Sequence, residues 1–223
     1  RGQWRPYLHH TVIYQSGTPL VCRFCHYCLD IRTDLSYNYG NRNDGNVNSI
    51  FAVEAHMEYL VGLDIGTSSV KGVLMSRDGK VENVKTKKHA YYWENNLKLL
   101  NADAFCDNCF SVIKELSDSL KDGDLIAGVC VSGAGGNLML VKDGKACSPV
   151  YGWQTEYDEA VIGEALAPLT AESVYNTIGW PKLNSFPLAA LGYLKATNPQ
   201  ALADADMVCM HIEYLAYKLS GAW

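Results

Sequence analysis

The chain has 223 residues, of which 48% are hydrophobic and 19% are charged, a composition typical of a globular protein with a sizeable core. Its net charge of −5 gives no strong basic surface and argues against a nucleic-acid partner. The sequence has no apolar run of about 18 residues and does not open with a signal segment, so we expect a cytoplasmic protein without a membrane partner.

Residues 1–56 differ in composition from the rest of the chain. They contain five arginines and no lysine, whereas residues 57–223 contain thirteen lysines and one arginine, Arg77. They show no sustained helical or strand periodicity. Three cysteines and a histidine within 22–28 are of zinc-ligand type, although an accidental cluster is the favoured interpretation. We expect residues 1–56 to be a disordered or artefactual extension that ends near Met57.

From Met57 onward the pattern alternates between strands and helices. Hairpin turns are indicated at Asp78-Gly79 and Asp143-Gly144, and from Glu156 the pattern is helical with prolines at the boundaries. Periodicity alone predicts an α/β fold. The expected elements are strands at 58–64, 70–76 and 80–89, a helix at 102–120, and strands at 125–131, 138–141 and 146–150.

The segment Asp64-Ile-Gly-Thr-Ser-Ser-Val-Lys71 is the most informative part of the chain. It predicts a strand, a tight polar turn and a second strand. Such a turn can offer backbone N–H groups and hydroxyls to phosphate oxygens. Asp64, at the end of a buried strand, is placed to hold a hydrated Mg²⁺. An ordinary hairpin turn containing a glycine is the alternative.

Four blocks of the sequence form a pattern, at 64–71, 128–137, 149–154 and 186–195, the last followed by 205–208 and 213–221. In their order and spacing they resemble the FGGY family of carbohydrate kinases within the actin-like ATPase superfamily. The resemblance runs from about Met57 to Trp223 and is to xylulokinase-, gluconokinase- and glycerol kinase-like members. It implies a ribonuclease H-like α/β fold and an incomplete amino-terminal domain, at 57–223, of a two-domain sugar kinase.

The resemblance implies transfer of the γ-phosphoryl group of ATP, with Mg²⁺, to a hydroxyl of a small sugar or polyol. By match to the first block, Gly66, Thr67 and Ser68 are expected to contact phosphates. Asp64 is expected near the metal, which it holds through water. Lys71 aligns with a basic position that neutralises developing charge, and a solvated strand lysine is the alternative.

On the sugar side, the resemblance implies substrate contacts from Gly136, Asn137, Trp153 and Gln154. Many relatives carry Gln-Met-His after Ser-Gly, where this chain has Ala-Gly-Gly at 134–136 and lacks the imidazole. An indole face can stack on a sugar while an amide bonds a hydroxyl. The alternatives are a turn role for Asn137 and a core role for Trp153.

In this family the general base and the adenine-binding domain are expected beyond Trp223, so no catalytic residue is assigned here. We therefore expect this chain to be inactive alone. Two other classes stay open: a non-kinase ATPase of the actin-like superfamily, and a sugar- or nucleotide-binding module without activity. The sequence names neither the sugar nor the oligomeric state, and a homo-oligomer of the full-length protein stays open.

Overall fold

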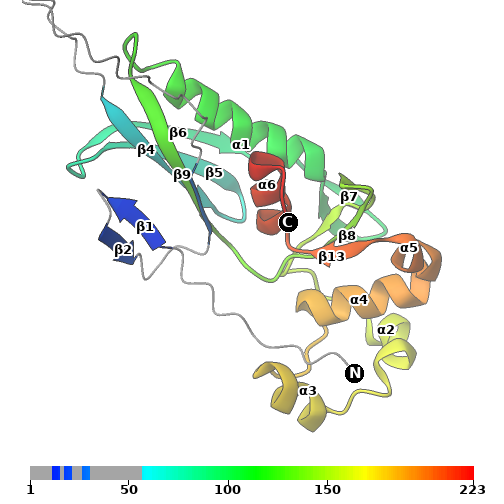
Figure 1. Cartoon of the computed structure of the whole chain (residues 1–223). Coiled ribbons are helices and arrows are strands. Elements are labelled where there is room, and N and C mark those ends of the chain that lie inside the picture. Colours follow the sequence, from blue (N-terminus) through cyan, green and yellow to red (C-terminus); the bar gives the residue numbers. More distant parts are fainter. Residues whose placement is uncertain (1–11, 16–17, 22–26, 31–56) are drawn as a thin grey trace, which may run out of the picture.

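The computed structural model describes the backbone of Val12–Gln15, Thr18–Val21 and Tyr27–Asp30, and the whole chain from residue 57 to 223. Its main sheet has five strands in the order β3-β9-β4-β5-β6 (Figure 1). These strands are β3 (Tyr27–Asp30), β4 (Glu58–Ile65), β5 (Ser69–Ser76), β6 (Val81–Lys88) and β9 (Leu125–Gly133).

Strands β4 and β9 are parallel, and the other neighbours in the sheet are antiparallel. The register places Asp64 beside Ser132 and Ile65 beside Gly133. Because parallel strands end at the same edge of a sheet, the turn after β4 and the glycine-rich turn after β9 leave the sheet side by side. The Ala134 N–H joins them by donating to the Ile65 carbonyl oxygen at 2.9 Å.

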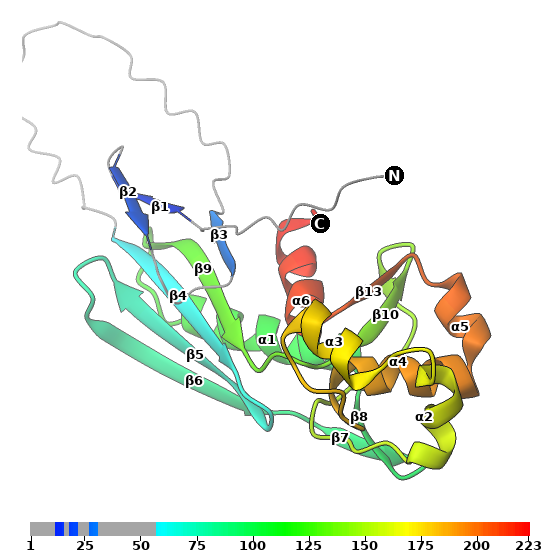
Figure 2. The ribbon, with the colours of Figure 1, turned by 90° about the horizontal axis from the view of Figure 1, so that it is seen from below.

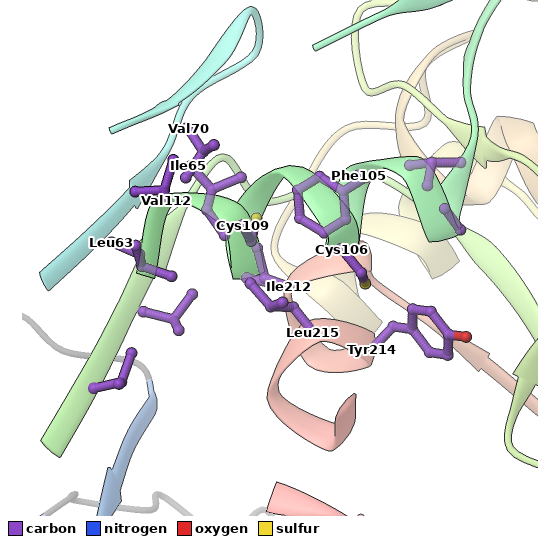
Figure 3. Close-up of a cluster of buried hydrophobic side chains, with 14 of the residues drawn as sticks. Leu63, Ile65, Val70, Phe105, Cys106, Cys109, Val112, Ile212, Tyr214 and Leu215 are labelled. Atoms are coloured by element: carbon purple, nitrogen blue, oxygen red, sulfur yellow. The ribbon is translucent and has the colours of Figure 1, made fainter. Parts of the chain in front are cut away.

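Helix α1 (Ala102–Ser117) packs on one face of this sheet over β4, β5 and β6, and helix α6 (His211–Ser220) packs beside it over β9 (Figure 3). The first turn of α1 is capped by Asn101, whose side-chain oxygen accepts from Ala104 N at 2.9 Å. Sequence periodicity predicts an apolar stripe along this helix, with Cys106 outside it. Four of the six stripe residues are buried, and Ile113 and Leu120 are partly buried. Cys106 is also buried because α6 covers that side of α1. The buried stripe residues are Phe105, Cys109, Val112 and Leu116.

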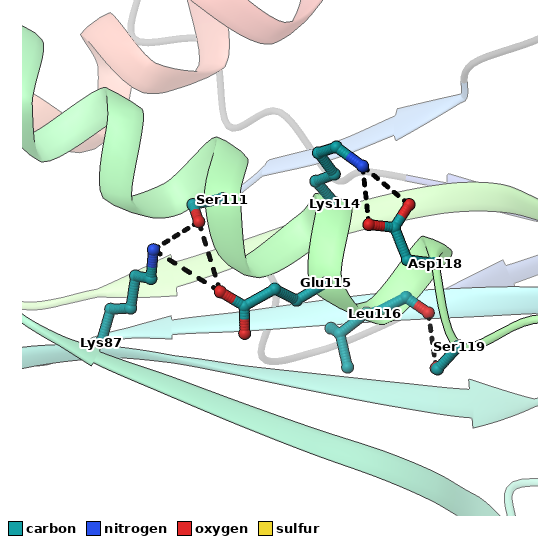
Figure 4. Close-up of polar contacts among 7 residues, drawn as sticks. All are labelled: Lys87, Ser111, Lys114, Glu115, Leu116, Asp118 and Ser119. Carbon is teal, nitrogen blue, oxygen red and sulfur yellow. Dashed lines mark hydrogen bonds and ion pairs between the residues drawn. The ribbon is translucent and has the colours of Figure 1, made fainter.

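The outer side of α1 carries exposed ion pairs (Figure 4). Lys114 contacts Asp118 one turn later at 2.6 Å, and Lys87 on β6 reaches Glu115 at 3.5 Å. Lys87 also donates to the Ser111 hydroxyl. Because these side chains are solvated, each pair contributes at most about 1 kcal/mol, and the buried side of α1 holds it on the sheet.

A glycine in β5 allows α1 to approach the sheet. A Cβ on Gly72 would lie 2.4 Å from Val112 Cγ1 and 2.9 Å from Leu116 Cδ1. We therefore expect Gly72→Ala to destabilise the chain by about 1–3 kcal/mol through overpacking, as measured by urea unfolding. The matched control is Gly62→Ala on β4, where a Cβ meets nothing within 4 Å. An equal effect at both positions would contradict this account.

The rest of the chain builds two small sheets, β11-β10-β13 and β12-β8-β7, and four helices (Figure 2). A second hydrophobic cluster, which includes Leu140, Ile162 and Leu194, holds this part together. Its strands are β7 (Tyr91–Glu94), β8 (Leu97–Leu100), β10 (Met139–Lys142), β11 (Lys145–Ala146), β12 (Val150–Tyr151) and β13 (Met207–Cys209). Its helices are α2 (Glu159–Leu166), α3 (Ala171–Ile178), α4 (Phe186–Thr197) and α5 (Pro199–Asp204).

Before residue 57 the described backbone forms β1 (Val12–Gln15), β2 (Thr18–Val21) and β3, where periodicity predicted no strand. Strand β3 forms because β9 would otherwise present an unpaired edge of the sheet. The two strands pair antiparallel. The assignment of 1–56 as an extension outside the family stays a prediction. The cysteine and histidine cluster lies at 22–28, whose side chains fall outside the described residues.

In the sequence the cysteines are scattered and lie mostly in apolar segments, which predicts reduced thiols. Cys106, Cys109, Cys147 and Cys209 are free, as predicted, whereas Cys130 on β9 is disulfide-bonded and corrects the expectation there. In the part of the chain that the structure describes, no helix is both long and apolar enough to span a bilayer.

Candidate functional site

The predicted phosphate turn joins β4 to β5 at the edge where β9 also ends. Alternation along β4 buries Leu63 and Ile65 against α1 and leaves Asp64 exposed on the opposite face of the sheet. In the antiparallel register Lys71 lies directly opposite Asp64, and it is also exposed. The two charged side chains therefore share the face of the sheet away from α1.

Within the turn, the Gly66 N–H donates to the Ser69 carbonyl oxygen at 3.0 Å. A phosphate contact through this N–H would compete with that bond. Thr67 is partly buried and Ser68 is exposed. The hydroxyl-bearing side chains are therefore the better candidates for new contacts to an anion.

Two residues that follow β6 brace the turn from behind. The His89 N–H donates to the Ser68 carbonyl oxygen at 2.9 Å, and the Tyr91 hydroxyl donates to the Thr67 carbonyl oxygen. Burial lowers the pKa of His89, and a hydrogen bond with the Gly66 backbone partly offsets this effect. The sequence predicted no element at Tyr91, and it placed His89 at the end of the strand 80–89 without giving it a role.

A cavity of about 430 Å³ opens beside the turn. Thr67 lines it together with three of the four predicted sugar-contacting residues, Asn137, Trp153 and Gln154. The β7–β8 hairpin adds Lys98, whose Nζ lies 4.3 Å from the centre of the Tyr91 ring. We call this hollow the polar cavity. The polar and aromatic lining residues that sequence reasoning did not select are Tyr91, Trp93, Asn96, Lys98, Thr155 and Glu156.

The Asn137 side chain is buried and bonded within the protein. Its carbonyl oxygen accepts the Trp153 N–H at 2.9 Å. Its amide nitrogen lies 3.2 Å from His211 Nδ1 and 3.3 Å from Nε2. This geometry supports the turn-fixing role for Asn137, which sequence analysis held open beside a sugar contact.

The fourth predicted residue, Gly136, lies at a different hollow of about 620 Å³, which we call the apolar cavity. Gly136 has a φ of +81°, and a Cβ there would lie 3.1 Å from the Phe186 ring and 3.2 Å from Trp153 Cβ. The positive φ and the close approach of these side chains both favour glycine at this position. The Phe186 ring lies between those of Trp153 and Trp180, at centroid distances of 5.9 and 5.2 Å.

Trp153 lines both cavities, and its indole nitrogen is buried without a hydrogen-bond partner among the described residues. A buried donor left unpaired is costly in a folded protein, so this one favours a ligand that accepts a hydrogen bond.

The side chains that could bind a metal limit the kind of metal site that this structure can form. Within the described part of the chain, no group of three or more His, Cys, Asp or Glu side chains could hold a metal ion. Mg²⁺ keeps several waters and needs only one or two protein carboxylates beside substrate phosphates. The exposed Asp64 carboxylate at the sheet edge fits that limited role.

Comparisons with known proteins identify the family of the chain. The sequence profile of the FGGY family of carbohydrate kinases, N-terminal domain, matches residues 59–223. A xylulose kinase of Lactococcus lactis subsp. lactis and an L-xylulose/3-keto-L-gulonate kinase of Escherichia coli are each 27% identical to the chain. Each match covers 74% of this chain and 33% or 34% of the relative, so the chain spans about a third of their length.

Among solved structures, the chain is similar to a gluconate kinase from Lactobacillus acidophilus, with a TM-score of 0.66 and 20% identity. That match covers 74% of this chain and 34% of the kinase. At this identity the likeness concerns the fold, and with the family match it confirms the α/β fold of a sugar kinase amino-terminal domain that the resemblance implied.

Proposed function

This chain belongs to the FGGY family of carbohydrate kinases, and from that premise we propose that it supplies the phosphate turn and the sugar site of an ATP-dependent kinase. The reaction is transfer of the γ-phosphoryl group of ATP to a hydroxyl of a small sugar or polyol. Such transfer depends mainly on positioning and electrostatic stabilisation rather than on covalent chemistry by the protein.

One observation carries the proposal. Thr67 belongs to the turn expected to bind phosphate, and Trp153 and Gln154 belong to a segment expected to bind sugar, yet all three line one cavity. The turn after β4 lies beside the turn after β9, and Asn137 of that second turn accepts the Trp153 backbone N–H, which brings the Trp153–Gln154 segment to the same cavity. Phosphoryl transfer needs donor and acceptor in contact, and a shared cavity is the arrangement that it requires.

On the nucleotide side, the Thr67 and Ser68 hydroxyls donate to phosphate oxygens, and Gly66 lets the turn approach them. Asp64 would hold Mg²⁺ through bound water, and Lys71 opposite it would offset phosphate charge. The metal supplies charge neutralisation on the transferred group when it is bound.

On the sugar side, the polar cavity offers amides, hydroxyls and aromatic faces, the mixture that suits a polyhydroxylated ligand. The buried indole N–H of Trp153 supplies a donor for a sugar oxygen. The exposed amide of Gln154 can both donate and accept. The apolar cavity, where the Ser185 hydroxyl and the indole N–H groups of Trp153 and Trp180 are the only polar side-chain groups among the lining residues, suits a sugar less well.

The chain alone is proposed to bind ligands without turning them over. It spans about a third of its curated relatives, and none of its carboxylates is assigned as the base that receives the sugar hydroxyl proton. General base assistance is typically worth about 10²–10⁴ in rate. Sugar-dependent ADP release by this chain, compared with the full-length gene product, tests the point. Rates within tenfold of each other would place the base inside these residues.

The direct test is a binding screen of this chain against ketopentoses, hexoses, polyols and gluconate. We expect the indole N–H signal of Trp153 to shift in NMR spectra with at least one class of ligand. The same panel, with ATP and the full-length gene product, reports phosphoryl transfer. Binding of MgATP without any response to the panel would favour a non-kinase ATPase of the same superfamily.

Gln154→Ala is expected to weaken sugar binding by about tenfold, since one hydrogen bond to a neutral group is worth about 1 kcal/mol and more if a buried partner is left unpaired. Affinity for MgATP and the melting temperature should stay unchanged, because Gln154 is exposed. Isothermal titration with the best ligand of the panel measures both affinities. The control is Gln200→Ala on α5, outside the two cavities. Unchanged sugar affinity would remove Gln154 from the site.

A further inference from the structure

His211 lies behind the polar cavity, at the start of α6, and its side chain is 3% exposed. Neither the sequence motifs nor the proposed chemistry uses it. It contacts Asn137, which is 74 positions earlier in the chain and lines the polar cavity. The contact therefore connects a buried imidazole on α6 with the wall of the proposed sugar site.

The hydrogen bonds around Asn137 fix which way its amide faces. Its carbonyl oxygen accepts from the Trp153 backbone N–H, so its amide nitrogen is the atom that faces His211. An amide nitrogen only donates. The imidazole must therefore present an unprotonated nitrogen, and a protonated ring would set two donors against each other.

Ring packing and a backbone hydrogen bond hold the His211 imidazole in place. Its ring packs against Phe105 at a centroid distance of 4.8 Å, and the His89 ring lies 5.5 Å from Phe105 on the sheet side. The backbone just before it is fixed because the Met210 N–H donates to Glu213 Oε2 at 2.7 Å. Burial, with His89 nearby, lowers the pKa of His211 to about 4, which keeps the ring neutral near pH 7.

We propose that His211 is a positioning residue of the sugar site, which orients the Asn137 amide so that its oxygen holds the Trp153 backbone. Through this relay the imidazole sets where the indole lies between the two cavities. The role of Trp153 as a sugar contact rests on the proposed function, whereas the relay itself does not.

Two variants of His211 separate positioning from space filling. His211→Phe keeps a ring against Phe105 but removes the acceptor, and His211→Gln removes the ring but keeps an acceptor oxygen. In the folded chain, we expect the Trp153 backbone amide to exchange with solvent about tenfold faster in the Phe variant. The Gln variant should stay within about threefold of the wild type. Far-UV circular dichroism shows whether each variant folds.

Asn137→Leu alone, compared with His211→Gln, keeps the proposal testable if His211→Phe is poorly folded, and a double-mutant cycle tests the relay further if it folds. Asn137→Leu alone should accelerate Trp153 exchange as His211→Phe does, and combining both should add little because they interrupt one relay. Three results would overturn the proposal: faster Trp153 amide exchange in His211→Gln than in His211→Phe, equal acceleration in both variants, or additive effects in the double variant.

Sugar affinity measured on the same variants separates this inference from the proposed function. If the sugar site is real, the best ligand of the panel should bind more weakly to His211→Phe than to His211→Gln. If no sugar binds any form, while Trp153 exchange follows the expected order, the relay stands and the proposed sugar site fails.

Discussion

Lowering the pH from 6.5 to 4 is expected to destabilise the chain by about 3 kcal/mol through His211 alone. Its pKa is lowered from 6.5 to about 4 in the folded state because burial disfavours the charged ring and His89 adds to the effect. The unfolded chain therefore takes up a proton in this pH window that the folded chain refuses. The stability is fully present above pH 6.5 and is lost as the pH falls toward 4.

Urea unfolding at steps from pH 7 to pH 4 measures this slope, and the His211→Phe variant isolates it. The variant starts from lower stability, since the Asn137 amide loses its acceptor, but it should lack most of the pH dependence of the wild type. Carboxylates titrate in both proteins and cancel in the comparison. His89 also has a lowered pKa and accounts for part of the slope that remains. Parallel slopes would mean that His211 is not buried in its neutral form.

Four of the five strands of the main sheet, all except β3, were predictable because their signals are local. Alternation marks β4 and β5, and Asp78-Gly79 marks the turn before β6. The stripe at Phe105, Cys109 and Val112 likewise identified α1. Each signal lies within a few residues of the element that it specifies, so a single sequence was sufficient to find them.

The β7–β8 hairpin was missed although it carries a turn signal. Asn95 and Asn96 adopt φ values of 49° and 62°, the left-handed pair that a two-residue hairpin requires. Only Asp-Gly pairs were interpreted as hairpin turns in the sequence. Tyr91 and Lys98 were therefore not included among the candidate site residues, although both line the polar cavity. Asparagine tolerates positive φ better than other non-glycine residues, and this signal was available.

The partner of Asn137 could not be predicted in this way. His211 reads as one polar residue at the start of an amphipathic helix, and only the packing of α6 against α1 brings it to the polar cavity. The same holds for Gly136, whose place at the apolar cavity depends on Phe186 from α4. Such contacts between distant segments leave no periodicity in the sequence.

Thr67→Val is expected to weaken binding of MgATP to the chain by roughly ten- to a hundredfold. The substitution keeps the shape of the side chain and removes one hydroxyl, and a hydrogen bond to a charged group contributes about 1.5–3 kcal/mol. The carbonyl of residue 67 still accepts from Tyr91, so the turn should keep its conformation. Titration with MgATP, and turnover by the full-length gene product, measure the loss.

Two further variants show whether the hydroxyl or the turn conformation is responsible. Thr67→Ser keeps the hydroxyl and should bind MgATP within about threefold of the wild type. Tyr91→Phe keeps every group of the turn but removes the donor that holds the Thr67 carbonyl, so any loss there reports positioning. If Thr67→Val binds MgATP as the wild type does, the segment from Asp64 to Lys71 is an ordinary hairpin turn. The shared cavity would then no longer support phosphoryl transfer, because its donor side would be missing.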